Sequence, residues 1–436
     1  MSRRRSAAIA STSNGYFRPL ASNPDGEGAD RFFWDILSTH GWCHPLASQL
    51  HSKMNARSVA PITSSLIALP MHGEIKALEG GLRTRDGHLL QWLTQQVDDL
   101  TIVSRPEPFP RLQFARARHS RLQRAPAMPS RAVIVSPEAF APLAPLRGRG
   151  WWSASTTHLP VIAGEGAILA WNPFAAAHYL RQAPKRSLTF DFLDDWLVHP
   201  AFRKLRTKTE LAYAEICNSA VNIFCNSEGT LARAHSFGRA DAQLLPNGCD
   251  PGRFSAVDDR RSGRTVIGYA GKIGSRVDFA LIAKAIDRMP QCDFVLAGPA
   301  MDRDTARTLK VLRADCPGDV HYDDYPALLS SFDIGWVPHH VGHGEVGGDA
   351  IKLYEYRATG LPSFSAPIIG AARLPGVRVA DGDTLIHMMS DVVANSNGGR
   401  VAREPLELAR EHTWEEKSLV ILKAMAPYLR IGLPPK

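Results

Sequence analysis

Lys352 and Glu355 are the residues whose types and spacing best suit binding chemistry. They lie three positions apart in the stretch GHGEVGGDAIKLYEYRATGLP, residues Gly342–Pro362, so they would be close neighbours on the surface of a helix. The pattern predicts a helix that ends at Gly360, because glycine with a proline two residues later is typical of a helix C-terminus. The helix would thus carry a cation near its start and a carboxylate one turn deeper.

Two glycines, Gly347 and Gly348, precede this helix and would let the backbone approach a ligand without a Cβ atom in the way. The unpaired N–H groups of the first helical turn and the helix dipole favour an anion at that point. A diphosphate at the helix N-terminus and a pair of sugar hydroxyls on Glu355 would satisfy this geometry. An ordinary amphipathic helix, in which Lys352 and Glu355 form a solvated pair, explains the same pattern equally well.

Charged residues also follow two of the apolar runs that resemble strands. Lys272 and Arg276 come after the run VIGYA and lie beside Gly271. Cations in a glycine-containing loop between a strand and a helix suit phosphate binding, although solvated loop charges would look the same. Asp194 and Asp195 follow another run, where they could anchor an acceptor hydroxyl or cap the next helix.

Neither the histidines nor the cysteines have the spacing of a metal site. His339, His340 and His343 lie close together, but they fit no standard zinc pattern. The six cysteines are scattered along the chain, as expected for small buried residues in a reducing cytosol. We therefore expect no metal.

Composition and charge indicate a globular chain with a basic segment. The 436 residues are 44% hydrophobic and 22% charged, which suits two sizeable domains, and no apolar run is long enough for a membrane span. The formal net charge is +8, and six arginines lie between Arg111 and Arg131 without an acidic residue. Interleaved Leu112, Phe114 and Leu122 favour contact with an anionic membrane or an acceptor; a solvated loop is the alternative.

Short apolar runs alternate with helical patterns along most of the chain. The first unit joins the run SLIALP, which ends at Pro70, to a helix at His88–Gln96 and a strand at Leu100–Ser104. A second series begins with the strand Val266–Ala270 and includes a short strand at Val320–Tyr322. This order predicts two successive α/β halves, each with a mostly parallel sheet and helices on both faces.

Several segments resemble the GT-B glycosyltransferases, in particular the large retaining family called glycosyltransferase family 4. Leu245–Asp250, LPNGCD, is similar to the family's turn after the last strand of the N-terminal domain. Gly268–Ile273, GYAGKI, and Phe294–Pro299, FVLAGP, resemble the opening strands of its C-terminal domain. Asp349–Pro362 resembles the helix of members that build bacterial surface polysaccharides. The match covers about residues 64–430 and is more specific in the C-terminal half.

The resemblance implies the GT-B architecture, in which two Rossmann-like α/β domains face each other across a cleft. It divides the chain into four predicted parts: a partly disordered extension at 1–60, an N-terminal acceptor domain at 61–250, a C-terminal nucleotide-sugar-binding domain at 251–405, and C-terminal helices at 406–436 that pack back on the N-terminal domain.

The resemblance also assigns roles by position. Lys272 and Arg276 fall where the family places cations on the donor diphosphate, and Glu355 matches the second Glu of its E-x7-E motif, which holds the ribose. The first Glu falls at Gly347, so Glu345 or Asp349 would have to supply that carboxylate. The implied catalytic residues are Lys272, Arg276, Asp194 and Asp195; the implied donor-binding residues are Gly271, Lys272, Arg276, Tyr322, Glu345, Gly347, Gly348, Asp349, Lys352 and Glu355; and Gly80, Gly81 and Arg85 belong to the acceptor or N-domain loop.

The predicted function is transfer of a hexosyl group from a UDP- or GDP-linked sugar to a saccharide or lipid-linked acceptor. The resemblance implies retention of configuration and a role in polysaccharide or glycolipid biosynthesis. The nucleotide sugar is a substrate, so no cofactor is expected, and no nucleic acid partner is expected. The expected location is cytoplasmic, with peripheral contact on the inner face of the cytoplasmic membrane as an option.

Two other functions are alternatives to transfer. A non-catalytic GT-B scaffold in a polysaccharide-assembly complex is motivated by Gly347, where the family has a carboxylate. A Rossmann oxidoreductase is disfavoured, because no G-x-G-x-x-G follows the first strand.

Overall fold

The computed structural model describes residues 61–122, 124, 128–129, 131–139, 150–254, 263–342, 349–396, 401–404 and 408–429. These residues belong to one unit of the chain, Pro61–Lys436. The extension predicted at 1–60 lies outside the described residues. No helix in the described part combines the length and the apolar character that a membrane span requires.

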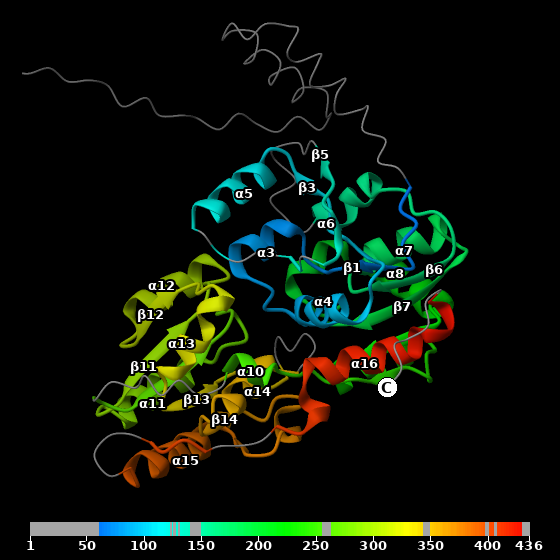
Figure 1. Ribbon diagram of the computed structural model, residues 1–436. Helices are drawn as coiled ribbons and strands as arrows, with labels where there is room; N and C mark the ends of the chain where they lie inside the picture. Colours follow the sequence, from blue (N-terminus) through cyan, green and yellow to red (C-terminus); the bar gives the residue numbers. More distant parts are fainter. Residues whose placement is uncertain are drawn as a thin grey trace, which may run out of the picture. The chain divides into compact units, whose positions relative to one another are not determined.

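The first half of the described chain folds around a parallel sheet in the order β4-β2-β1-β6-β7-β8-β9 (Figure 1). Its central strands are apolar runs in which every residue is buried, such as LIAL in β1 and GAILA in β6. Burial of both faces is typical of parallel strands that are covered by helices on both sides. The strands are β1 (Leu66–Leu69), β2 (Leu100–Val103), β4 (Val133–Val135), β6 (Gly166–Ala170), β7 (Arg186–Phe192), β8 (Asn222–Cys225) and β9 (Gln243–Leu244), and the main helices are α3 (Glu74–Gly80), α4 (Arg85–Gln96), α7 (Pro173–Gln182), α8 (Arg206–Ser219) and α9 (Glu228–Ser236).

The second half forms another parallel sheet, in the order β12-β11-β10-β13-β14-β15. Its first strand, β10, pairs in parallel with both β11 and β13 and is therefore internal to the sheet. The strands are β10 (Val266–Ala270), β11 (Asp293–Ala297), β12 (Asp315–Gly318), β13 (Ile334–Val337), β14 (Ser363–Ser365) and β15 (Val377–Val379), and the helices are α10 (Pro251–Phe254), α11 (Phe279–Arg288), α12 (Arg303–Val311), α13 (Tyr325–Ser330), α14 (Ile351–Ala358), α15 (Gly382–Ala394) and α16 (Trp414–Met425).

Helix α16, the last of the described helices, packs with the first half of the chain rather than with the second. Trp414, Ile421 and Met425 belong to the same apolar core as β1 and β6. The Ser418 hydroxyl donates to the Gln96 side-chain oxygen at 3.0 Å, at the end of α4. Figure 1 shows this red helix beside α4. The chain thus crosses between the two sheets more than once.

Both sheets reverse their strand order next to their first strand. β1 lies between β2 and β6, and β10 lies between β11 and β13. Ligands of open parallel sheets bind beyond the carboxyl ends of the strands at such a reversal. The loops at these two points are Pro70–Gly73 after β1 and the segment that begins with Gly271 after β10.

Some short elements differ from the sequence-based expectation. Helix α3 was not predicted, because its seven residues are too few to show a helical repeat. The arginine-rich stretch forms α5 (Arg111–Arg121), in which only Leu112 is buried. The strand expected at Val320–Tyr322 is wrong: β12 ends at Gly318, whose φ of 84° breaks the extended chain, and Tyr322 begins a 3-10 turn. The remaining small elements are β3 (Glu107–Pro108), β5 (Glu138–Ala139) and α6 (Gly150–Ala154).

Candidate functional site

The candidate site is a pocket that receives residues from both sheets. It lies at the carboxyl ends of β1 and β10, where the two strand orders reverse. His72, Gly81 and Asp194 line it from the first half, and Lys272, Lys352 and Glu355 line it from the second half. Residues that are up to several hundred positions apart in the sequence therefore meet around one space, as expected for a ligand site between two domains.

Three cations line the side of the pocket that follows β10. Lys272 and Arg276 come from the loop after that strand, and Lys352 comes from the first turn of α14. Gly271 makes this approach possible, because a Cβ atom there would lie 2.5 Å from Cε of Lys352. The Lys352 ammonium lies 5.2 Å from the centroid of the Tyr269 ring, an attractive cation–π distance.

The electrostatics show that these cations act on one another. Burial, together with the positive charges of Arg276 and Lys272, lowers the pKa of Lys352 from its usual 10.5 to about 7, while Glu355 opposes the shift. A buried lysine beside two other cations is stabilised in its charged form by an anion. The arrangement is therefore suited to a ligand with at least two negative charges.

Glu355 faces the same pocket one turn further along α14. It is only 4% exposed, so a solvated pair with Lys352 is excluded. Its Oε1 atom accepts a hydrogen bond of 2.8 Å from the Tyr322 hydroxyl. Burial raises the pKa of Glu355 to about 7, and the Tyr322 hydrogen bond and the Lys352 charge act in the opposite direction. A carboxylate in this position can accept further hydrogen bonds from ligand hydroxyls.

Tyr322 is held between the two halves of the chain. Its ring lies 5.0 Å from the His88 ring of α4, and the Arg253 guanidinium lies 4.8 Å above it. Gly81 approaches from the first half with φ of 73°, and a Cβ atom there would lie 2.8 Å from Tyr322 Cβ. Glycine is therefore required at this point both for its backbone angle and for the close approach.

The other predicted residues of the first half divide into two groups. Asp194 lines the pocket, whereas the neighbouring Asp195 accepts from Arg233 Nε at 2.8 Å and from the Leu197 N–H at 3.0 Å. Asp195 thus stabilises a turn and binds helix α9 through Arg233. Gly80 ends helix α3 and Arg85 is a buried residue of α4, and neither is among the residues that line the pocket.

Asp349 lines the pocket just before α14, but its carboxylate already has protein partners. It accepts from the Asn247 backbone N–H and from the Tyr354 hydroxyl, the latter at 3.2 Å. Glu345, Gly347 and Gly348, the other residues predicted here, lie outside the described residues, as does His343.

Several lining residues were not predicted from the sequence. Asp86 in the first turn of α4 accepts a hydrogen bond of 2.9 Å from the Met71 N–H, and burial raises the pKa of its carboxyl. Arg83 lines the pocket and binds Asp319 at 2.6 Å. The only sequence feature that could have indicated Asp86 and Arg83 was their position after the first strand.

Two of the three neighbouring histidines, His339 and His340, lie within the described residues. His339 lines the pocket, and its Nε2 atom lies 3.1 Å from the Tyr269 hydroxyl. Burial lowers the pKa of His339 well below its usual value, so the ring is neutral at pH 7. No group of three metal-binding side chains occurs within the ranges that the structure describes.

Comparison with known proteins gives matches among solved structures only. No protein-family model and no curated protein matches the chain. The chain is similar to HepE of Anabaena in complex with UDP and glucose, at 12% identity over 83% of this chain and 95% of that chain, with a TM-score of 0.51. It is also similar to the alpha,alpha-trehalose 6-phosphate synthase of Burkholderia multivorans, at 12% identity over 84% and 95%, and to the UDP-forming enzyme of Burkholderia vietnamiensis, at 13% over 85% and 100%, both with a TM-score of 0.51.

At such low identities the likeness shows the fold alone. The two parallel sheets with reversed strand orders agree with it. The prediction from the sequence is confirmed: the chain has the GT-B architecture, in which two Rossmann-like α/β domains face each other across a cleft.

Proposed function

We propose that the protein is a glycosyltransferase that moves a hexosyl group from a nucleotide diphosphate sugar to a saccharide or lipid-linked acceptor. The observation that carries this proposal is the convergence of Lys272, Arg276 and Lys352 on one side of the pocket. Glu355 lies one helical turn away, at a place suited to ribose hydroxyls. A structural neighbour of the same fold was solved with UDP and glucose, which favours UDP over GDP as the nucleotide.

In the proposed reaction, the bond between the anomeric carbon of the sugar and the diphosphate oxygen breaks. The acceptor hydroxyl oxygen bonds to that carbon, and its proton passes to an oxygen of the departing diphosphate. Negative charge grows on the leaving group, and Lys272, Arg276 and Lys352 stabilise it. Attack from the face that the leaving group vacates gives retention, as the resemblance to glycosyltransferase family 4 implies.

The acceptor would enter from the first half of the chain, where Asp194 lines the pocket. A carboxylate there can accept a hydrogen bond from the attacking hydroxyl and so orient it. A role in polysaccharide or glycolipid biosynthesis belongs to the same proposal.

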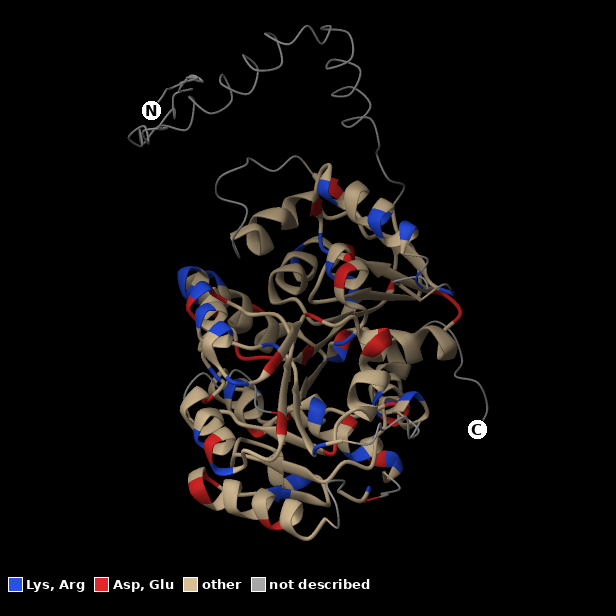
Figure 2. Cartoon of the chain, turned by 90° about the vertical axis from the view of Figure 1, so that its left-hand side faces the viewer, with Lys and Arg blue, Asp and Glu red and all other residues tan. Residues whose placement is uncertain are grey.

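A peripheral contact with an anionic membrane is a further part of the proposal, and it is carried by α5. Phe114 and Leu122 are 71% and 57% exposed, and Arg118 and Arg121 are exposed beside them. Arg118, Arg121 and Leu122 follow Phe114 by four, seven and eight residues, a spacing that places all four side chains on one helical face. Basic and acidic residues are otherwise interspersed over the helices in Figure 2. Apolar and basic groups on one face favour an anionic lipid surface.

The proposal is tested with a panel of UDP-, GDP- and ADP-linked sugars. We expect at least one donor to raise the melting temperature and to release its nucleotide slowly in the presence of water or an acceptor. Binding by one donor without turnover on any acceptor would favour the non-catalytic scaffold suggested by Gly347. Absence of both binding and nucleotide release across the panel would contradict both functions.

A further inference from the structure

Asp349 is tied to the turn that follows β9 by several hydrogen bonds. Its carboxylate accepts from the Asn247 backbone N–H, and its backbone carbonyl accepts from the Asn247 side-chain amide at 2.7 Å. The Tyr354 hydroxyl donates to the same carboxylate at 3.2 Å. The Asp349 side chain is only 2% exposed, so these partners replace water as its hydrogen-bond donors.

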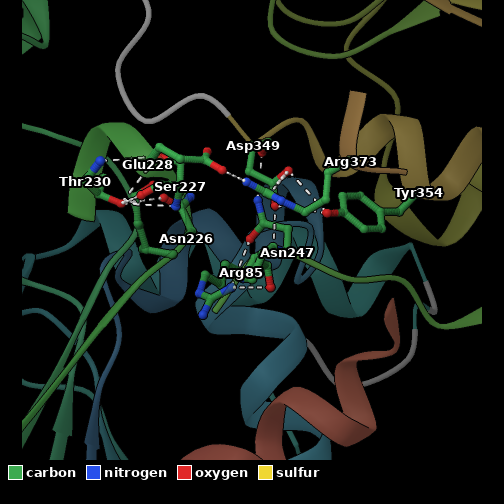
Figure 3. A network of polar contacts seen from close by, with 11 residues as sticks. Arg85, Asn226, Ser227, Glu228, Thr230, Asn247, Asp349, Tyr354 and Arg373 are labelled. Carbon is green, nitrogen blue, oxygen red and sulfur yellow. Dashed lines mark hydrogen bonds and ion pairs between the residues drawn. The ribbon is translucent and has the colours of Figure 1, made fainter. Parts of the chain in front are cut away.

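This contact belongs to a longer network of alternating charges. On one side, Arg373 lies 3.5 Å from the Asp349 carboxylate and also pairs with Glu228, the first residue of α9. On the other side, Arg85 donates to the Asn247 side-chain oxygen at 3.2 Å. Figure 3 shows Arg373 between Glu228 and Asp349, and Asn247 between Asp349 and Arg85.

The network is anchored in the first sheet. Arg85 Nε donates to the Asp191 carboxylate of β7 at 2.7 Å, and the Trp171 indole N–H donates to the same oxygen at 2.7 Å. Asp191 and Arg85 are 0% and 1% exposed, so the pair is desolvated and fixed in position. Removing one partner of such a buried pair is strongly destabilising, because it leaves the other charge buried without compensation.

The carboxylate of Asp349 has little capacity left for a donor sugar. Two carboxylate oxygens offer about four acceptor positions. The Asn247 N–H and the Tyr354 hydroxyl use this capacity, and Arg373 lies close enough to pair with the charge. A sugar hydroxyl would therefore compete with these protein partners for the carboxylate.

We propose that Asp349 is a positioning residue, which fixes the start of α14, and with it Lys352 and Glu355, against the first sheet through Asn247. Asp349 lies three residues before Lys352, so a displacement at Asp349 moves the cation directly. The inference rests on the proposed function in one respect, because it assigns Lys352 and Glu355 to the donor. It differs from the sequence-based prediction, which places Asp349 among the donor-binding residues.

The first test compares Asn247→Ala with Asp349→Ala and with the double variant. Asn247 is buried and is not among the residues that line the pocket. Asn247→Ala removes the side-chain bonds to the Asp349 carbonyl and to Arg85, whereas Asp349→Ala removes the bonds of the carboxylate. We expect each single variant to lower kcat by about 10²-fold, as displaced catalytic groups do, and the double variant to lower it little further. Parental kcat in Asn247→Ala with a large loss in Asp349→Ala would contradict the inference and return Asp349 to direct donor contact.

The matched control is Asp324→Asn, which removes an exposed ion pair of 3.0 Å with Arg124 and no buried contact. We expect it to keep the parental kcat and KM. A role of Asp349 in stability alone would lower the melting temperature of its variants and leave kcat and KM unchanged, and this result would also overturn the inference.

The second test needs no activity, so it separates this inference from the proposed function. The apparent pKa of Lys352 is measured in the ligand-free protein from the pH dependence of its labelling by an amine reagent, with exposed Lys284 as reference. Release of α14 admits water, so we expect the pKa of Lys352 to rise toward its usual value in Asn247→Ala and Asp349→Ala. An unchanged pKa in both variants would refute the positioning role, even if the parent transfers no sugar.

Discussion

At the scale of single residues, the protonation of Lys352 and Glu355 should control donor affinity. The pKa of each is about 7 in the ligand-free protein, Lys352 because burial lowers it and Glu355 because burial raises it. A diphosphate prefers the charged lysine, so affinity should fall as the pH rises above 7. Ribose hydroxyls prefer the ionised carboxylate, so affinity should also fall as the pH drops below 7. On the alkaline and on the acidic limb of this pH profile, donor affinity should change by at most about tenfold per pH unit, because one proton is exchanged on each limb.

The dissociation constant of a UDP-sugar measured from pH 5.5 to 9 checks this expectation, since its diphosphate does not titrate in that range. Lys352→Met should remove the alkaline limb and Glu355→Gln should remove the acidic limb. Affinity of the parent that does not change with pH would contradict the placement of both residues at the donor.

Glu355 should also matter for nucleotide binding as a hydrogen-bond acceptor. Glu355→Ala removes a carboxylate that can accept two ribose hydroxyls, which should cost about 1.5–3 kcal/mol per lost hydrogen bond. Titration calorimetry with UDP measures this change, and Glu415→Ala, at an exposed position of α16, is the control. Equal affinity of the Glu355 variant and the parent would refute the ribose assignment.

At the scale of elements, α5 can be tested apart from the pocket. Charge reversal of Arg118 and Arg121, which are exposed beside Phe114, should reduce binding to vesicles that contain anionic lipid. Arg116 is left unchanged, because it binds Glu74 at 2.7 Å and its reversal would disturb α3.

The control for this experiment reverses Arg303 and Arg307, two exposed arginines of α12. Both double variants change the net charge of the protein equally. A difference in vesicle binding between them therefore reflects where the charges lie and not the total charge. Co-sedimentation with vesicles is the measurement. If the α5 variant sediments as strongly as the parent, the proposed membrane surface is discarded.

The elements that could be predicted are those with a strong local signal. The sequence predicted α14 and its end at Gly360, because the glycine–proline pattern and the tyrosine-rich helix are visible locally. It missed α3, which is short, and α5, whose apolar residues are mostly exposed and show no core-facing repeat. It also missed the β12 position, because the residues DCPG have little intrinsic preference for a strand.

At the scale of the whole molecule, the sequence predicted the GT-B fold but not which side chains meet. Arg83 and Asp319 are 236 residues apart, and Asn247 and Asp349 are 102 residues apart. The sequence around each of these residues does not indicate which distant residue it contacts, because such pairs depend on how the two sheets come together. The predicted cations Lys272, Arg276 and Lys352 do line one pocket, because the strand–helix order alone already placed them at one edge of the second sheet.

The last helix connects the core of the molecule to the site. Trp414 of α16 is 1% exposed, and its ring stacks on His88 at 4.9 Å, next to Tyr322. Trp414→Ala should lower the free energy of unfolding by about 3–5 kcal/mol, as expected for a large buried aromatic residue. Chemical denaturation measures the loss, and Trp414→Phe should recover part of it. A loss below about 1 kcal/mol would show that α16 does not belong to the core.

The central claim is that the diphosphate of the donor binds between Lys272 and Arg276, and steady-state kinetics with the donor found in the panel tests it most directly. Charge on the leaving group grows as the bond breaks, so Lys272→Ala and Arg276→Ala should each lower kcat by about 10²–10³ and weaken donor binding less. The double variant should be far from additive, and Arg276→Lys should recover only part of the rate. If both single variants keep the parental kcat, the diphosphate binds elsewhere and the assignment of this pocket is contradicted.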